Sequence, residues 1–340
     1  MADLSTKYMG VELDSPVVVA SCSLSGLIDN IKRAEEAGAG ALVIKSLFEE
    51  QIMLERMKLE EDLGVGAEKF PESLTYFPRA EHAGPRQHLM WMEKTRRAVK
   101  MPLFGSLNAV KPGSWVSYAK QMEETGVDGL ELNVYAVQTD PNKSASDIEQ
   151  ELYENVERVV AEVSIPVAVK LDPFYTSVAN VAGELDRRGV RALVLFNRFV
   201  QPDIDTTTES LSHKMEYSEP REIKVPLRWI ALLYGRVKAD LAASTGAHDA
   251  EDVVKYLLAG ATVVQVAGVL YAKGLDHIST ITGDLTKWMD GKGYKRLADF
   301  RGRVSQKKAA DPFLFERAQY VDLLLKQSFS ALSSQPREEL

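Results

Sequence analysis

The sequence predicts a (β/α)8 TIM barrel with long loops on its carboxyl-terminal face and a helical tail after the barrel. Two observations support this prediction. Eight short apolar runs are typical of strands buried in a parallel sheet, and helical patterns lie between them. A doubly wound open sheet is the alternative, but no glycine-rich dinucleotide motif follows the first strand. Eight repeated units favour a closed barrel.

The predicted strands and helices alternate along the chain. Several helical patterns end in glycine just before the next strand, as at Gly126 and Gly189, which is a common helix stop. The predicted strands span residues 14–21, 41–45, 102–108, 129–133, 166–171, 192–197, 241–245 and 262–266. The predicted helices span residues 29–38, 86–99, 115–125, 145–163, 177–188, 226–237 and 249–258.

Long segments follow the second, fourth and sixth strands, on the side where barrel enzymes place their chemistry. They span residues 46–85, 134–144 and 198–225. Within the first of these segments, the apolar spacing of residues 49–58 predicts an amphipathic helix. A compact closing segment is expected at 293–302. Residues 313–325 predict an amphipathic helix that packs on the barrel or on another subunit. We therefore expect a barrel domain at 1–306 and a helical extension at 307–340.

Composition narrows the class of partner. The chain is 45% hydrophobic and 26% charged, and its net charge of -8 argues against nucleic acid and anionic membranes. Its single cysteine, Cys22, excludes a disulfide framework and cysteine clusters for zinc or iron-sulfur centres. The amino terminus does not resemble a signal peptide, and the longest apolar stretch, 257–270, is too short to span a bilayer. We expect a cytoplasmic protein with a small-molecule ligand and no metal.

Polar residues end several of the predicted strands. The valine-rich run 164–171 presents Lys170, and the run 40–45 ends in Lys45. An ammonium group is costly to bury alone, so each lysine must reach water or an anionic ligand. Asn108, Asn133 and Asn197 occupy similar strand ends. In a closed barrel, all five residues would face one mouth.

The last two strands end in small residues. Ser244, Thr245 and Gly246 end the seventh strand, and Ala267 and Gly268 follow the eighth. Loops after these strands are a frequent phosphate site in barrels, because exposed backbone amides favour an anion. Glycine that merely permits the turns is the alternative explanation.

Together these motifs resemble the dihydroorotate dehydrogenase family, which are flavoproteins built on this barrel. The resemblance extends from about Leu13 to Val304 and rests on the segments Ala20-Ser21, 43–46, Glu131-Leu132-Asn133, 167–171, 244–247, 260–266, Gly293-Tyr294 and 297–302. The chain has no hydrophobic amino-terminal helix for quinone and no cysteine set for an iron-sulfur centre. The resemblance is therefore greatest to the soluble fumarate-type branch, which implies pyrimidine biosynthesis and a homodimer.

The resemblance implies that FMN lies across the barrel mouth. Lys170 would lie near the flavin pyrimidine edge and Lys45 near the substrate, both as catalytic residues. Asn133 and Asn197 would bind substrate or flavin through their amides. The remaining implied flavin contacts are Ala20, Ser21, Asn108, Ser244, Thr245, Gly246, Ala267 and Gly268.

The sequence departs from the family where the substrate would bind. Ala136 replaces the cysteine or serine base, and the adjacent Tyr135 is a candidate base whose pKa near 10 would need strong lowering. Residues 70–78 replace the family's substrate segment, and 221–229 replace its glycine pairs. Arg198 follows Asn197, so a carboxylate or phosphate on the substrate is expected.

The sequence thus predicts an FMN-dependent oxidoreductase acting on CH–CH bonds, with hydride passing from a dihydropyrimidine-like or anionic substrate to flavin. Two alternatives stay open. One is a flavin-free lyase or aldolase that forms a Schiff base on Lys170 or Lys45 with a phosphorylated substrate. The other is a catalytically silent FMN-binding homologue, which Ala136 suggests.

Overall fold

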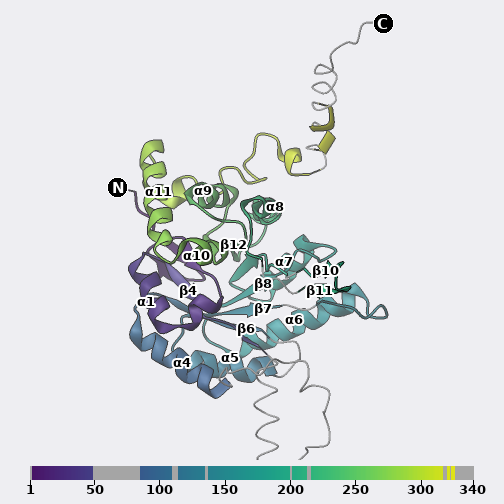
Figure 1. The fold of residues 1–340 in the computed structure, drawn as a ribbon. Helices are drawn as coiled ribbons and strands as arrows, with labels where there is room; N and C mark the ends of the chain where they lie inside the picture. The colour runs from purple at the N-terminus through teal and green to yellow at the C-terminus, as the bar shows by residue number, and fades with distance from the viewer. Residues whose placement is uncertain are drawn as a thin grey trace, which may run out of the picture.

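A closed barrel of parallel strands forms the centre of the molecule (Figure 1). The computed structural model describes residues 2–48, 85–108, 114–134, 137–199, 201–212, 216–316, 320–321 and 323–325. The barrel closes where β6 pairs with β4, with Leu103 opposite Leu42. The predicted (β/α)8 fold is confirmed. In order around the barrel the strands are β4 (Ala41–Val43), β3 (Val17–Val19), β13 (Val263–Val266), β12 (Asp240–Ser244), β9 (Ala192–Leu195), β8 (Val167–Leu171), β7 (Gly129–Asn133) and β6 (Leu103–Asn108).

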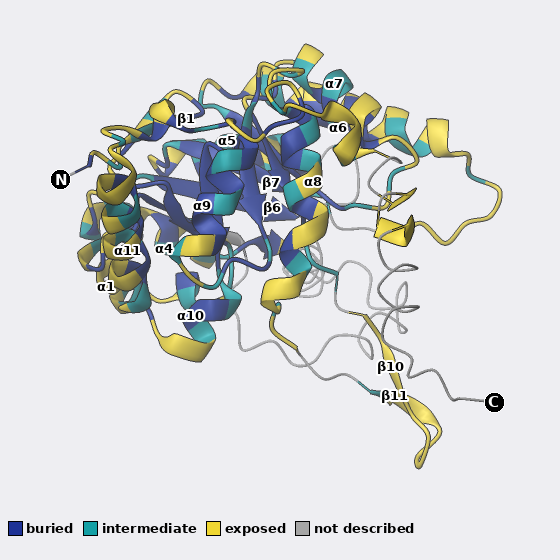
Figure 2. Ribbon diagram, turned by 90° about the horizontal axis from the view of Figure 1, so that it is seen from above, coloured by how far each residue is buried: buried dark blue, intermediate teal, exposed yellow. Residues whose placement is uncertain are grey.

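Helices surround the strands, which form a buried centre beneath an exposed helical surface (Figure 2). Side-chain caps mark several helix starts: the Ser144 hydroxyl accepts from the Asp147 amide, and the Asp249 carboxylate accepts from the Asp252 amide. The helices are α1 (Ile28–Glu36), α4 (Pro85–Ala98), α5 (Ser114–Glu124), α6 (Ala145–Glu162), α7 (Val178–Arg187), α8 (Lys224–Leu233), α9 (Ala250–Ala259), α10 (Gly268–Lys273) and α11 (His277–Lys292).

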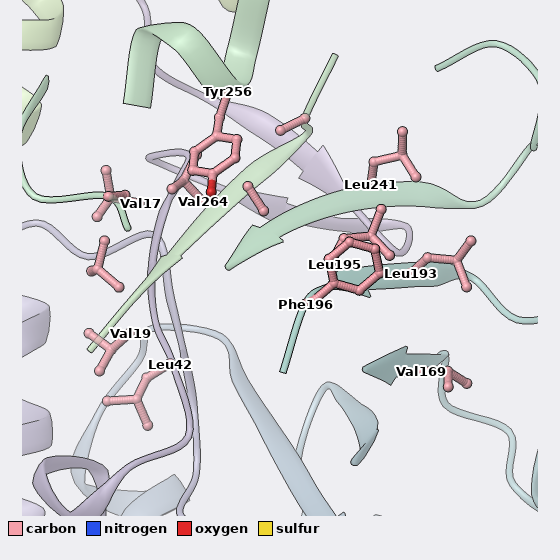
Figure 3. Packing of buried hydrophobic residues seen from close by; sticks show 14 of the residues in the cluster. Val17, Val19, Leu42, Val169, Leu193, Leu195, Phe196, Leu241, Tyr256 and Val264 are labelled. Carbon is pink, nitrogen blue, oxygen red and sulfur yellow. The ribbon is translucent and has the colours of Figure 1, made fainter. Parts of the chain in front are cut away.

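Two apolar cores lie on opposite faces of the strands. The larger one fills the space between strands and helices, where Tyr256 of α9 lies near Val17 and Val264 (Figure 3). The smaller one fills the barrel interior, mostly with valine and alanine, because a barrel of this size leaves little room for side chains. Both faces of each strand are therefore buried.

An antiparallel hairpin closes the amino-terminal end of the barrel. It consists of β1 (Thr6–Tyr8) and β2 (Val11–Leu13). The Tyr8 ring contacts the Phe104 ring edge to face, with 5.6 Å between centroids. The Met9 amide donates to Asp240 at the start of β12, at 2.8 Å. The opposite end of the barrel, where the strands finish, is therefore the end that this hairpin leaves uncovered.

Several elements were not predicted. They are the β1–β2 hairpin, β5 (Leu47–Phe48), which pairs with β6, a hairpin of β10 (Asp203–Asp205) and β11 (Ser210–Ser212), and helices α10 and α11. The β10–β11 hairpin lies within the predicted long segment 198–225, and it extends away from the barrel with exposed side chains (Figure 2). Two predictions fall outside the described residues. They are the amphipathic helix at 49–58 and the segment 70–78, which replaces the family's substrate segment.

After α11 the chain forms the compact segment that the sequence predicted, with a turn of 3-10 helix at Leu297–Asp299. In the tail, Pro312–Phe315 is also a 3-10 turn, and Phe315 packs against the main core. The described helical residues 320–321 and 323–325 are exposed. Packing of the tail on the barrel or on another subunit stays a prediction. Within the described ranges, we find no helix with the length and apolar character needed to cross a membrane.

Candidate active site at the barrel mouth

The upper part of the barrel interior is polar. Successive side chains of a strand alternate between its two faces, so residues two apart share a face. Ala168 and Val263 belong to the apolar interior, and Lys170 and Gln265 follow them by two residues on β8 and β13. Glu131 lies between these two side chains from β7. Carboxylate, ammonium and amide thus form one layer above the apolar interior.

Lys170 and Glu131 form a buried ion pair. The Lys170 ammonium lies 3.7 Å from Glu131 Oε1 and donates to Gln265 Oε1 at 3.4 Å, and Gln265 Nε2 in turn donates to Glu131 Oε2 at 2.5 Å. The two charged side chains are 7% and 2% exposed. A buried ammonium needs such a counter-charge. Both contacts of the ammonium are long, so it retains hydrogen-bonding capacity for a ligand at the mouth.

Asn133 and Asn197 meet at the next level of the mouth. Asn133 ends β7, and Asn197 Nδ2 donates to Asn133 Oδ1 at 2.7 Å. The backbone amide of Asn197 donates to Leu171 O at 2.6 Å. This hydrogen bond fixes the chain two residues beyond the end of β9. Asn133 Nδ2 and Asn197 Oδ1 have no hydrogen-bond partner among the described residues, so they can recognise a planar imide-like edge.

A chain of serine hydroxyls joins three neighbouring strands on the opposite side of the mouth. Ser21 Oγ lies 2.9 Å from Ser46 Oγ, which lies 2.7 Å from the fully buried Ser106 Oγ. The chain fixes the backbone after β3 next to the backbone after β4. It therefore positions Ala20 and Lys45, two of the predicted flavin contacts.

Lys45 lies two residues beyond β4 and is half-buried, near His88 of α4. Burial and the positive charge of Lys45 lower the pKa of His88 to about 4, so the imidazole is neutral at neutral pH. Its Nε2 is buried and has no hydrogen-bond partner among the described residues. Asn108, at the end of β6, is buried as well.

Three backbone segments converge where β12 and β13 end. Thr245 has a left-handed backbone with φ of 82°, which is uncommon for a residue other than glycine and is frequent at functional sites. A Cβ atom on Gly246 would lie 2.5 Å from Ile223 N, and one on Gly268 would lie 3.0 Å from Ser218 Oγ. Glycine therefore allows the segment at 218–223 to approach both turns. The amides of Gly246 and Gly268 donate to no described residue, which leaves them available to an anion.

The guanidinium of Arg198, a predicted substrate residue, is bound to the protein itself. Arg198 Nε donates to Glu222 Oε1 at 2.9 Å, and its Nη1 donates to Glu216 O at 2.5 Å, so its guanidinium holds the segment at 216–222. Tyr135 and Ala136 lie outside the described residues. Asn133, which is bonded to Asn197, thus lies opposite Lys170 in the sheet, whereas Arg198 is directed to a neighbouring loop.

Comparison with known proteins agrees with this barrel and its mouth. The model of the family described as dihydroorotate dehydrogenase matches residues 82–289, more than half of the chain. The chain belongs to the dihydroorotate dehydrogenase family. The dihydroorotate dehydrogenase B (NAD(+)) catalytic subunit of Thermoplasma acidophilum is 25% identical over 307 residues, which cover 89% of this chain and 99% of the relative. The putative dihydroorotate dehydrogenase A (fumarate) of Aeropyrum pernix is 25% identical over 317 residues, which cover 88% and 97%.

Similar dihydroorotate dehydrogenases thus carry names of both the NAD(+) and the fumarate types. The fumarate-type branch therefore stays a prediction for this member. Sequence reasoning also missed site residues of this dehydrogenase-family barrel: Glu131, Gln265, Ser46, Ser106 and His88. The sequence held a signal for the first two, since Glu131 precedes Asn133 by two residues and Gln265 is a polar residue within the apolar run 263–266.

Proposed function

We propose that this protein is an FMN-dependent oxidoreductase of the dihydroorotate dehydrogenase type, acting on a CH–CH bond of a small dihydropyrimidine-like or anionic substrate. The observation that carries the proposal is the buried Lys170 ammonium, which Glu131 and Gln265 hold at the barrel mouth. When bound, FMN would accept a hydride from the substrate. The family supports this function, and the donor set at the mouth supports the cofactor.

Each group at the mouth has a defined task in this proposal. Lys170 would hold the pyrimidine edge of the cofactor with its positive charge, and Glu131 and Gln265 keep the ammonium in position. Asn133 and Asn197 orient a planar ligand through their amides. The glycine turns at 246 and 268 would hold the cofactor phosphate.

The proton acceptor is the part of the proposal that departs from the family. Alanine at position 136 cannot remove a proton, so the substrate proton must pass to another group. Tyr135 is the adjacent candidate.

The ion pair of Arg198 with Glu222 weakens the expectation of an anionic substrate and favours an uncharged dihydropyrimidine-like ring.

The test starts from the visible spectrum of the isolated protein and the release of FMN on denaturation. Lys170→Ala should lose retained flavin or slow its reduction by about 10²–10³-fold, because it removes the charge that stabilises the reduced ring. Lys287→Ala is the matched control, since Lys287 is an exposed lysine paired with Asp284 on α11.

A colourless protein that takes up no added FMN would refute the proposal. Borohydride trapping of a carbonyl substrate on Lys170 or Lys45 would instead support the Schiff-base lyase. Flavin that is bound and photoreduced, yet reoxidised by no candidate acceptor, would support the silent homologue.

A further inference from the structure

The segment that leads into α8 crosses the two glycine turns at the barrel mouth. We call this segment, residues 216–223, the strap. Beyond the flanking residues, the three atoms nearest to a Cβ built on Gly246 or on Gly268 all belong to the strap. The closest are Ile223 N at 2.5 Å and Ser218 Oγ at 3.0 Å. The strap therefore lies directly against both turns whose amides are available to an anion.

Apolar burial contributes little to holding the strap in place. Five of its eight residues are exposed, and only Ile223, its last residue, is buried. A segment with few buried apolar contacts opens locally at a low cost in free energy. The position of the strap must therefore depend on polar and aromatic contacts from neighbouring loops.

Arg198 ties the two ends of the strap together. It lies in the loop after β9, and its Nε donates to Glu222 Oε1 at 2.9 Å while its Nη1 donates to Glu216 O at 2.5 Å. The guanidinium is a planar fork, so these two acceptors are held at a fixed separation. The same contact neutralises the Glu222 carboxylate, which would otherwise repel an anion at the turns.

His248 holds the middle of the strap. It follows Gly246 by two residues, and its Nε2 donates to Ser218 O at 2.6 Å, because a carbonyl oxygen can only accept. The His248 backbone is itself fixed, since its amide donates to Asp252 Oδ2 at 3.0 Å and its carbonyl accepts from His277 Nε2 at 2.9 Å. One rigid turn thus presents the Gly246 amide and anchors the strap beside it.

An aromatic contact joins the strap to the second turn. The Tyr217 ring stacks on the Tyr271 ring, with 4.8 Å between centroids and 13° between planes. Tyr271 belongs to α10, the helix that begins at Gly268, and its hydroxyl accepts from the Ser23 amide at 2.9 Å. Contacts from three separate loops therefore hold the strap over the two turns.

We propose that Arg198 and His248 are positioning residues that hold the strap against the Gly246 and Gly268 turns, and that this closed arrangement is required for tight binding of a phosphate monoester there. The identity of the ligand as FMN rests on the function proposed above. The contacts that hold the strap do not depend on it.

Amide hydrogen exchange followed by mass spectrometry measures opening of residues 216–223 in the full-length protein without a ligand. Arg198→Met removes both contacts to the ends of the strap and should accelerate exchange of this segment at least about fivefold. His248→Ala should accelerate it as well. His248→Gln keeps an amide donor for Ser218 O and should exchange like the parent.

Arg96→Met is the matched control for the loss of an arginine. Arg96 also donates to a carboxylate and a carbonyl, Asp128 Oδ2 at 2.8 Å and Val99 O at 2.7 Å, but these lie before β7 and β6 begin. The control should leave exchange of residues 216–223 unchanged, even if it lowers the stability of the whole protein.

Flavin binding tests where the strap acts, by comparing FMN with riboflavin, which lacks the phosphate. Arg198→Met and His248→Ala should weaken FMN binding about five- to tenfold and riboflavin binding less than about twofold. An equal loss for both flavins would overturn the proposal, because the strap would then not act at the phosphate. Unchanged exchange of residues 216–223 in Arg198→Met would overturn it too.

Inorganic phosphate separates this proposal from the proposed function. A protein that binds no flavin would refute the flavin proposal. In that case, phosphate that slows exchange of residues 216–223 in the parent but not in Arg198→Met would support the strap. No effect of phosphate on exchange in such a protein would overturn both proposals.

Discussion

Lys170 illustrates how a single charged residue is accommodated inside an apolar barrel. Its side chain is 7% exposed, so water contributes little to stabilising the ammonium. Glu131 supplies the opposite charge, and Gln265 links the two by contacting both. Removing both charges from such a pair is often neutral, whereas removing one is strongly destabilising. The stability of the barrel and the charge at its mouth therefore depend on the same three side chains.

Glu131→Gln tests this dependence directly. The change keeps the size of the side chain and removes the counter-charge, so we expect the free energy of unfolding to fall by about 3 kcal/mol. Adding Lys170→Met to the same protein should restore most of the loss, because neither charge then remains buried. Urea unfolding followed by circular dichroism measures both variants. Equal stability of Glu131→Gln and the parent would show that the ion pair contributes nothing.

At the scale of elements, Glu123 joins α5 to the segment between α6 and β8. Its carboxylate accepts from the Ser164 amide at 2.8 Å, from the Ser164 hydroxyl and from the Lys120 ammonium at 2.9 Å. The Ser164 hydroxyl, followed by Lys120, lowers the pKa of Glu123 to about 2. This one side chain thus fixes the approach of β8, the strand that carries Lys170.

Glu123→Gln should lower the free energy of unfolding at pH 7 by about 1.5–3 kcal/mol, the range for hydrogen bonds to a charged group. Because the folded pKa lies below the ordinary value of 4.5, the carboxylate stabilises the fold above that pH. The contribution is then lost as the pH falls from about 4.5 toward 2. Unfolding curves at pH 7 and pH 3 should therefore show a smaller difference between variant and parent at pH 3.

The exposed neighbour Glu124 provides the matched control. Glu124→Gln makes the same change of charge on the same helix and should alter stability by less than about 0.5 kcal/mol. An equal loss in both variants would mean that net charge, rather than the contact with Ser164, determines the effect.

At the scale of the whole molecule, closure of the barrel depends on close approach of the chain at the start of its strands. The Gly40 amide donates to Val17 O at 2.8 Å, just before β4 begins. A Cβ atom on Gly40 would lie 1.9 Å from the backbone oxygen of Ser15, which is far inside contact distance. Only glycine permits β3 and β4 to approach each other at this point.

Gly40→Ala should therefore destabilise the protein by about 3 kcal/mol, since backbone atoms must separate to admit the methyl group. Gly283→Ala is the comparison, because Gly283 lies within α11 and its Cβ would meet no atom within 4 Å. That change should stabilise the protein by about 0.5–1 kcal/mol. Thermal unfolding of the two variants measures the contrast. A similar melting temperature for both would contradict the close approach at Gly40.

The sequence predicted every barrel strand, because continuous apolar runs are needed wherever both faces of a strand are buried. It predicted less well the elements whose patterns are weak. The helix α11 contains Gly283 and Gly291, and β1 and β2 have three residues each, so neither carries a clear periodic signal. The lysines and asparagines at strand ends were found because polar residues stand out there.

By itself, then, the sequence determined the closed barrel, its family and the level at which Lys170, Asn133 and Asn197 lie. Which face of each strand points inward was decided only by the tertiary structure, because burial on both faces leaves no alternation to read. The pairing of Glu131 with Gln265 joins residues 134 positions apart. Such contacts depend on how the strands close around one another, and local patterns along the chain do not encode that closure.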